Sequence, residues 1–199
     1  MQLLIDELGL VKPGYRILHI APERGIFDRI HEVPEIEYHS FDLQPEQYEY
    51  AGASAMDLAT DAEHLPSNFY DLIIHSHVME HVPCNITAVL FHLHRSLSQR
   101  GTHLFCVPIL SGASDEFLGE MEDAERIARF GQIDHVRRFG TQDIQKTIGM
   151  VFEIPLHYEL ESVVPAQTLE NYNIPAHARS GFTSSTVFVV AKSQLKLVS

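Results

Sequence analysis

Acidic residues stand at the ends of three successive apolar runs in the first third of the sequence. Glu23 follows the run 16–21, Asp42 ends the run 36–42, and Asp57 lies in a weaker run around 53–58. Carboxylates can pair with an ammonium group and can accept hydrogen bonds from ribose hydroxyls. The pattern therefore predicts a negatively lined crevice that suits a ligand with ribose hydroxyls and a positively charged group.

The turn after the first apolar run, residues 18–25, is not a glycine-rich phosphate loop. Only Gly25 of a possible three glycines is present, Pro22 has no N–H to offer, and Glu23 stands where a pyrophosphate would bind. A dinucleotide is therefore not expected, and a nicotinamide-dependent oxidoreductase is the least favoured class. Simpler interpretations stay open for two of the acids: Glu23 can serve a helix dipole, and Asp42 can start a turn before Pro45.

The elements that position these acids alternate between strands and helices. Apolar runs predict strands at 16–21, 36–42, 70–76, 102–108, 151–156 and 185–192, with a weaker one at 53–58. Helical patterns lie at 25–31, 86–97 and 141–148, the last with Thr141 as its expected cap. This alternation predicts an α/β fold in which helices cover a parallel sheet and ligands bind beyond the carboxyl ends of its strands.

Length and composition favour one globular domain over residues 1–199, with 45% hydrophobic residues and no visible linker or repeat. Within it, the long segments 111–140 and 163–182 are expected to cover the acceptor side of the site. The balance of 14 Lys+Arg against 27 Asp+Glu disfavours nucleic-acid and anionic membrane partners. Two cysteines and no long apolar run favour a cytoplasmic protein, and the oligomeric state stays open.

The stretch 70–83 carries the most specific pattern. Its Tyr70-Asp71 pair and its Glu80-His81-Val82 segment resemble class I S-adenosylmethionine-dependent methyltransferases, specifically the type 11 group. The Ala21-Pro22-Glu23 turn and the segment 130–140 look like a subgroup of that group. The resemblance implies a doubly wound, Rossmann-like, mostly parallel seven-stranded sheet with helices on both faces and the last strand antiparallel.

The same resemblance implies a function. S-adenosylmethionine would be the methyl donor, S-adenosylhomocysteine the product, and a small molecule or a sugar-containing compound the acceptor. The alternative is a methyltransferase-fold module that binds or interacts without catalysis, because the glycines of the first turn are altered.

The resemblance also assigns the donor-binding residues by their place in the chain. The methionine part would contact Ala21, Glu23 and Gly25, and the ribose would contact Asp42 and Leu43. The adenine would contact Asp57 and Leu58, and the sulfonium would lie beside His75 and Ser76. His19 stands where the family has an acid in the first strand, and Glu23 is expected to replace that acid as the partner of the donor's ammonium group. Asp61 remains an alternative to Asp57.

The acceptor side is assigned from histidines and from the two long segments. His77 and His135 are candidate general bases, and His81, Arg137 and Tyr172 are candidate acceptor contacts, although His81 could instead hold a loop. Arg137 could equally form an ion pair with the acidic stretch 115–125. A metal site of His75, His77 and His81 lacks a completing ligand, so no metal is expected.

Overall fold

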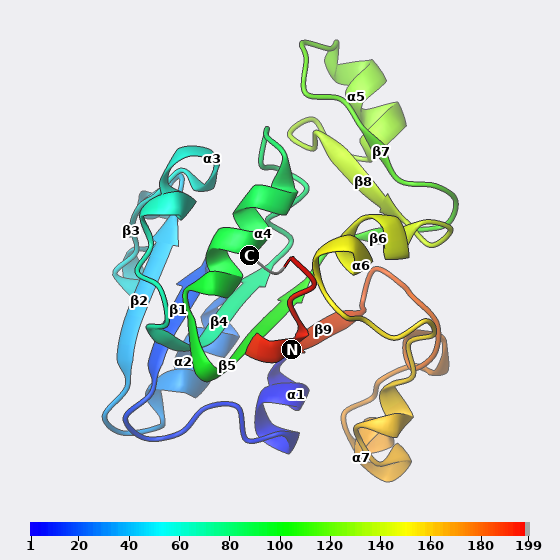
Figure 1. Cartoon of the computed structure of the whole chain (residues 1–199). Helices are drawn as coiled ribbons and strands as arrows, with labels where there is room; N and C mark the ends of the chain where they lie inside the picture. Colours follow the sequence, from blue (N-terminus) through cyan, green and yellow to red (C-terminus); the bar gives the residue numbers. More distant parts are fainter. Residues whose placement is uncertain (198–199) are drawn as a thin grey trace.

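The computed structural model describes residues 1–197, and its centre is a six-stranded sheet (Figure 1). The strand order is β3-β2-β1-β4-β5-β9; the first five are parallel and β9 pairs antiparallel with β5. The strands are β1 (Arg16–Ile20), β2 (Glu37–Asp42), β3 (Ser54–Ala55), β4 (Tyr70–Ser76), β5 (Leu97–Cys106) and β9 (Val187–Ala191).

Helices cover both faces of this sheet. The α-helices are α1 (Gln2–Glu7), α2 (Arg24–His31), α3 (Leu58–Asp61), α4 (Ile86–Arg95), α5 (Asp123–Phe130), α6 (Ile148–Val151) and α7 (Ala166–Asn171). Short 3-10 helices lie at η1 (Pro45–Ala51), η2 (Ala62–His64), η3 (Ile144–Lys146), η4 (Leu160–Ser162), η5 (Ala176–Ala178) and η6 (Lys192–Gln194).

The two faces bury alternate residues of the same strands, because successive side chains of a strand point to opposite sides. Leu18 and Ile20 of β1 belong to the core that includes α4, whereas Ile17 packs with Ile26 and Ile30 of α2. The predicted doubly wound α/β fold with a mostly parallel sheet is therefore confirmed.

Two predicted elements are wrong, and both lie between β8 and β9. The expected strand 151–156 contributes only an isolated bridge between Phe152 and Leu195, so the sheet has six strands rather than seven. The expected helix 141–148 is replaced by η3 and the short α6, and Thr141 caps neither. Asp143 accepts hydrogen bonds from the backbone N–H and the hydroxyl of Ser114 instead, which holds this segment to the loop after β6.

Residues 109–140 form an arm that extends from the carboxyl end of β5 (Figure 1). Its small sheet has the order β6-β8-β7, with β6 (Ile109–Leu110), β7 (Asp115–Glu116) and β8 (Arg137–Gly140), and α5 lies at its tip. At Gly140 the chains approach so closely that a Cβ would lie 2.2 Å from the carbonyl carbon of Ala113. Only glycine fits at that crossing.

The segment 163–182, expected from the sequence as a second cover of the acceptor side, lies away from the arm. Val164 and Leu169 pack with Leu3 and Leu4 of α1 in a small apolar cluster, and Figure 1 shows α7 at the end of the molecule opposite to α3. In the described residues, no helix combines the length and the apolar character needed to cross a membrane.

Candidate functional site

Two hollows open at the carboxyl ends of the parallel strands. The first has a volume of about 420 Å³ and is lined by Ile20, Ala21, Asp42, Leu43, Gln44, Gln47, Tyr48, Met56, Asp57, Leu58, His77, Val78, His81, Val82, Pro83 and Asp134. The second has a volume of about 370 Å³ and is lined by Met1, Gln2, Glu23, Gly25, Ile26, Ser76, His77, Cys106, Ser184, Ser185 and Val187. His77 lines both, so the two hollows meet at this residue.

The structure divides the predicted donor-binding residues between these hollows. Those expected at the ribose and adenine, together with Ala21, line the first hollow: Asp42, Leu43, Asp57 and Leu58. Glu23, Gly25 and Ser76, expected near the methionine part and the sulfonium, line the second. Apart from Ala21, which was expected near the methionine part, the division follows the order of the parts along an adenosine-bearing amino acid.

Asp42 and Asp57 owe their positions to the strand ends and to backbone hydrogen bonds. Asp42 ends β2 and accepts a hydrogen bond from the N–H of Gln44 at 2.7 Å. Asp57 is the N-cap of α3 and accepts one from the N–H of Ala59 at 2.9 Å. Asp61, the alternative to Asp57, is not among the lining residues and accepts from the backbone N–H of Asp57 instead.

Glu23 takes part in a chain of polar contacts that starts inside the sheet. His19 is fully buried in β1, with Nδ1 2.9 Å from the hydroxyl of Tyr38 and Nε2 3.2 Å from Oε2 of Glu23. Burial lowers the pKa of His19 more than Glu23 raises it, so the imidazole is neutral at pH 7. Burial alone would raise the pKa of Glu23, but hydrogen bonds from His19 and Ser76 outweigh it and lower that pKa. Glu23 is therefore an anion aimed at the second hollow.

The turn after β1 has a left-handed backbone conformation, although an alanine and not a glycine occupies it. Ala21 has a φ of +49°, in the left-handed region, and its N–H donates to the carbonyl of Phe41 at 2.9 Å. A side chain costs about 1–2 kcal/mol in that region relative to the right-handed one. The turn thus has the conformation for which glycine is usually selected, and Ala21 occupies it under strain.

The loop after β4 supplies the wall shared by the two hollows. His77 also has a positive φ, +51°, and its Nδ1 lies 3.1 Å from Oε1 of the fully buried Glu80. Hydrogen bonds with the Cys106 side chain and with Glu80 raise the pKa of His77 to about 10. His77 is therefore protonated at neutral pH.

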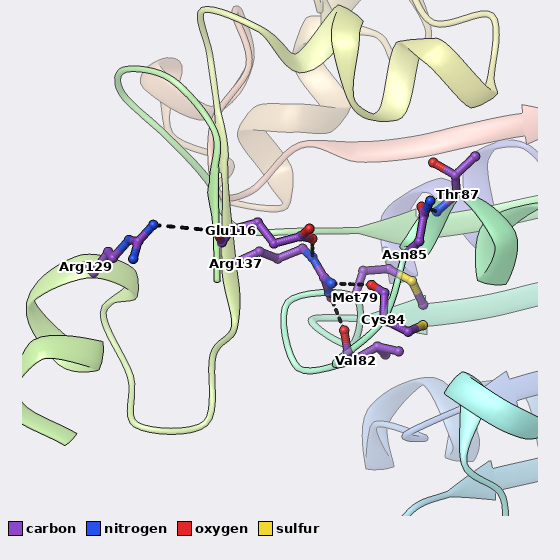
Figure 2. A network of polar contacts seen from close by, with 8 residues as sticks. All are labelled: Met79, Val82, Cys84, Asn85, Thr87, Glu116, Arg129 and Arg137. Carbon is purple, nitrogen blue, oxygen red and sulfur yellow. Dashed lines mark hydrogen bonds and ion pairs between the residues drawn. The ribbon is translucent and has the colours of Figure 1, made fainter. Parts of the chain in front are cut away.

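Arg137 holds this loop in place, as Figure 2 shows. Its guanidinium donates to the carbonyls of Met79, Val82 and Cys84, with distances of 2.7 Å to Val82 and 2.6 Å to Cys84. Its Nε donates to Glu116 at 2.7 Å, and the side chain is only 3% exposed. The role of acceptor contact expected for Arg137 is contradicted by this burial, and the alternative, an ion pair with the stretch 115–125, is what the structure contains.

Three further predicted site residues lie away from the hollows. His75 is fully buried, with Nε2 3.0 Å from Nε2 of His103 and its ring stacked on Phe105, so it faces the core rather than a sulfonium. His135 is buried behind His81, whereas His81 itself lines the first hollow. Tyr172 follows α7 and lines neither hollow.

Sequence reasoning did not assign several residues that line the first hollow: Gln47, Tyr48, Met56, Val78 and Asp134. Tyr48 and Gln47 come from η1, whose position over the sheet end depends on the fold of residues 44–52 rather than on a motif. Asp134 had a visible signal, because it precedes His135 in the segment 130–140 that carries the resemblance.

Comparisons with known proteins place the fold. Neither the known family models nor the curated proteins include a match to this chain. Among solved structures, the S-adenosylmethionine-dependent methyltransferase from Archaeoglobus fulgidus aligns with a TM-score of 0.59 and 15% identity, over 94% of this chain and 90% of that chain. The fold is that of the class I methyltransferases.

Two other solved structures are similar. The S-adenosylmethionine-dependent methyltransferase from Mesorhizobium loti has a TM-score of 0.56 and 16% identity, over 94% of each chain. Phosphoethanolamine N-methyltransferase 2 from Haemonchus contortus, solved with phosphomonomethylethanolamine and S-adenosylhomocysteine, has a TM-score of 0.52 and 14% identity, over 86% of this chain and 42% of that chain. At these identities the likeness concerns the fold.

Proposed function

We propose that this protein binds S-adenosylmethionine and transfers its methyl group to a small-molecule acceptor. The observation that carries the proposal is the distribution of acids over two adjoining hollows. Asp42 and Asp57 lie in the larger hollow and Glu23 in the smaller one, with His77 between them. The methyltransferase fold and the strand-end location support the same function.

Each half of the donor meets side chains of matching chemistry. Asp42 would accept hydrogen bonds from the ribose hydroxyls, and the exposed side chain of Leu43 would cover one face of the adenine with Met56 nearby. Glu23, an anion at neutral pH, would pair with the ammonium group of the methionine part.

The chemistry that the donor supplies is a methyl group on a positively charged sulfur. Transfer to an acceptor lone pair requires alignment of the two molecules, and the protein contributes by holding both in place. The two predicted bases are poorly suited to removing a proton, because His77 is already protonated at neutral pH and His135 is buried. The acceptor must therefore contact other groups of the first hollow. Among these, His81 and Asp134 are the side chains whose chemistry suits a general base.

Calorimetric titration of the full chain with S-adenosylmethionine and with S-adenosylhomocysteine tests the proposal. We expect one site per chain for both ligands, because both carry the ribose and the ammonium group. Asp42→Ala and Glu23→Gln should each weaken binding at least tenfold, a loss of about 1.4 kcal/mol. Asp123→Asn, an exposed acid at the start of α5, is the matched control and should bind as the unchanged protein does.

The alternative function, a non-catalytic module with this fold, predicts a different result. Such a module has no need of a donor pocket, so Asp42→Ala and Glu23→Gln would leave its ligand binding unchanged. Absence of heat at high micromolar donor, with the protein folded, would reject the methyltransferase proposal.

A further inference from the structure

A cluster of three metal-ligating side chains lies in the wall of the first hollow. Glu80 and His81 come from the loop after β4, and His135 comes from the arm just before β8. One donor atom from each of the three lies within 4.8 Å of the other two. The rings of His81 and His135 meet edge to face, with centroids 4.6 Å apart.

His135 is oriented through Nδ1, which leaves its Nε2 with the free lone pair. Nδ1 of His135 lies 3.2 Å from the carbonyl of Phe130, so it must carry the proton that this oxygen accepts. Nδ1 of His81 lies 3.2 Å from Oδ2 of Asp134, a close approach of imidazole and carboxylate. Metal-binding histidines usually have this arrangement, in which a carbonyl or carboxylate fixes the tautomer and the orientation of the ring.

Glu80 provides an independent sign of a cation. It is fully buried, and its Oε2 has no hydrogen-bond partner among the described residues. Its other oxygen, Oε1, is held by Nδ1 of His77 at 3.1 Å. A carboxyl oxygen buried without a hydrogen-bond partner is costly, and natural proteins rarely keep one unless it binds an ion or a water molecule.

We propose that Glu80, His81 and His135 bind a divalent metal ion, with zinc the best match, and that His77 and Asp134 position these ligands. Two imidazoles and one carboxylate are a set that zinc and related ions use at sites with an open coordination position. Because Zn–N and Zn–O bonds are about 2.0–2.2 Å, the three side chains would move closer together on binding. His81 lines the first hollow, so an ion held by these residues would be reached from that hollow.

This site differs from the trio His75, His77 and His81 considered from the sequence. His75 is in the core beside His103, and no metal was expected once a completing ligand was missing. The missing ligands are Glu80, three residues after His77, and His135, which lies 54 residues after His81 and reaches it only through the fold of the arm.

If the proposed function holds, on which this step rests, the metal defines the class of acceptor as an alcohol or a phenol. An acceptor oxygen bound at the open position would lose its proton more easily, because a metal ion lowers the pKa of a bound hydroxyl group. The oxygen would then form a bond to the methyl carbon while the carbon–sulfur bond breaks and its electron pair stays on sulfur. The products are a methyl ether, S-adenosylhomocysteine and one proton, which leaves to solvent.

The test titrates Zn²⁺ alone into chelator-treated full-length protein by calorimetry, and Co²⁺ by visible absorption. We expect one ion per chain and Co²⁺ bands typical of nitrogen and oxygen ligands. His81→Ala, at a partly exposed position, and the isosteric Glu80→Gln should each weaken Zn²⁺ binding at least 30-fold. His177→Ala removes an exposed histidine of η5 and is the matched control.

Two results would overturn the assignment: absence of Zn²⁺ binding, or equal binding by His81→Ala and the unchanged protein, which would reveal only adventitious surface histidines. Circular dichroism checks that Glu80→Gln folds, and His81→Ala decides the question if it does not. Acetohydroxamate, an oxygen donor, should shift the Co²⁺ bands, and unchanged bands would reject the open position. Donor titration is a separate measurement, so failure of the metal site and failure of the methyltransferase proposal are distinguishable.

Discussion

Arg137→Met is the substitution for which the structure gives the clearest magnitude. It keeps an apolar stem but removes the guanidinium that binds three carbonyls of the loop after β4. Val82 keeps a partner, because its carbonyl also accepts from the N–H of Cys84, whereas the carbonyls of Met79 and Cys84 lose the guanidinium as their donor. At about 1–3 kcal/mol for each unpaired buried carbonyl, and little for the half-exposed Glu116, the free energy of unfolding should fall by about 3–4 kcal/mol.

Urea unfolding followed by far-UV circular dichroism measures this change, since the chain has no tryptophan. A loss of that size corresponds to a decrease in Tm of about 10 °C for a chain of this length. Arg137→Lys keeps the charge without the planar guanidinium group. Its free energy of unfolding should lie between that of Arg137→Met and that of the unchanged protein. Arg100→Met, at an exposed position, should stay within about 0.5 kcal/mol of the unchanged protein. A loss below about 1 kcal/mol for Arg137→Met would refute the view that this side chain holds the loop.

Three further predictions concern the backbone and the core. Ala21→Gly should raise the free energy of unfolding, measured in urea titrations, by about 0.5 kcal/mol. The strain relieved at the positive φ exceeds the cost of the entropy that glycine adds to the unfolded chain. A decrease in the free energy of unfolding would argue against strain in this turn. Burial lowers the pKa of His75 to about 3, below its unfolded value of 6.5. The free energy of unfolding should therefore be at its full value above about pH 7.5 and fall by about 2 kcal/mol on going to about pH 5. A flat pH profile over that range in urea titrations would contradict this. Gly140→Ala should lower the melting temperature through a loss of about 3 kcal/mol, whereas Gly25→Ala, with nothing within 4 Å of the new Cβ, should lower it not at all.

The sequence predicted the sheet well where strands are apolar on both faces and poorly where residues are shared between elements. The run 70–76 coincides with β4, because both faces of this strand are covered and its central residues, Leu72, Ile73 and Ile74, are apolar and fully buried. The run 151–156 has similar residues, but Phe152 is used to fill the core beside Phe105 and His103, and the chain after it leaves the sheet. Periodicity cannot distinguish these two uses of a short apolar run.

For the site, the acids at strand ends were predictable and the polar groups inside the core were not. Asp42 and Asp57 line one hollow because the carboxyl ends of parallel strands meet at one edge. His75 and Arg137 have partners, His103 and Glu116, that are distant in sequence and that only the fold brings to them. A polar residue with a partner that is distant in sequence looks, in the sequence, the same as one that faces a ligand.

The place of His77 between the two hollows has a consequence for fragments of a ligand. A molecule that fills both hollows joins two separate pieces, one held beside Asp42 and the other beside Glu23. Adenosine and methionine should then bind independently and weakly, each to its own hollow, and together at the same time. The covalent link between the pieces raises the affinity through effective concentration rather than through new contacts. The ratio of the affinity of the joined ligand to the affinities of its pieces therefore measures how freely a ligand can extend past His77 from one hollow into the other.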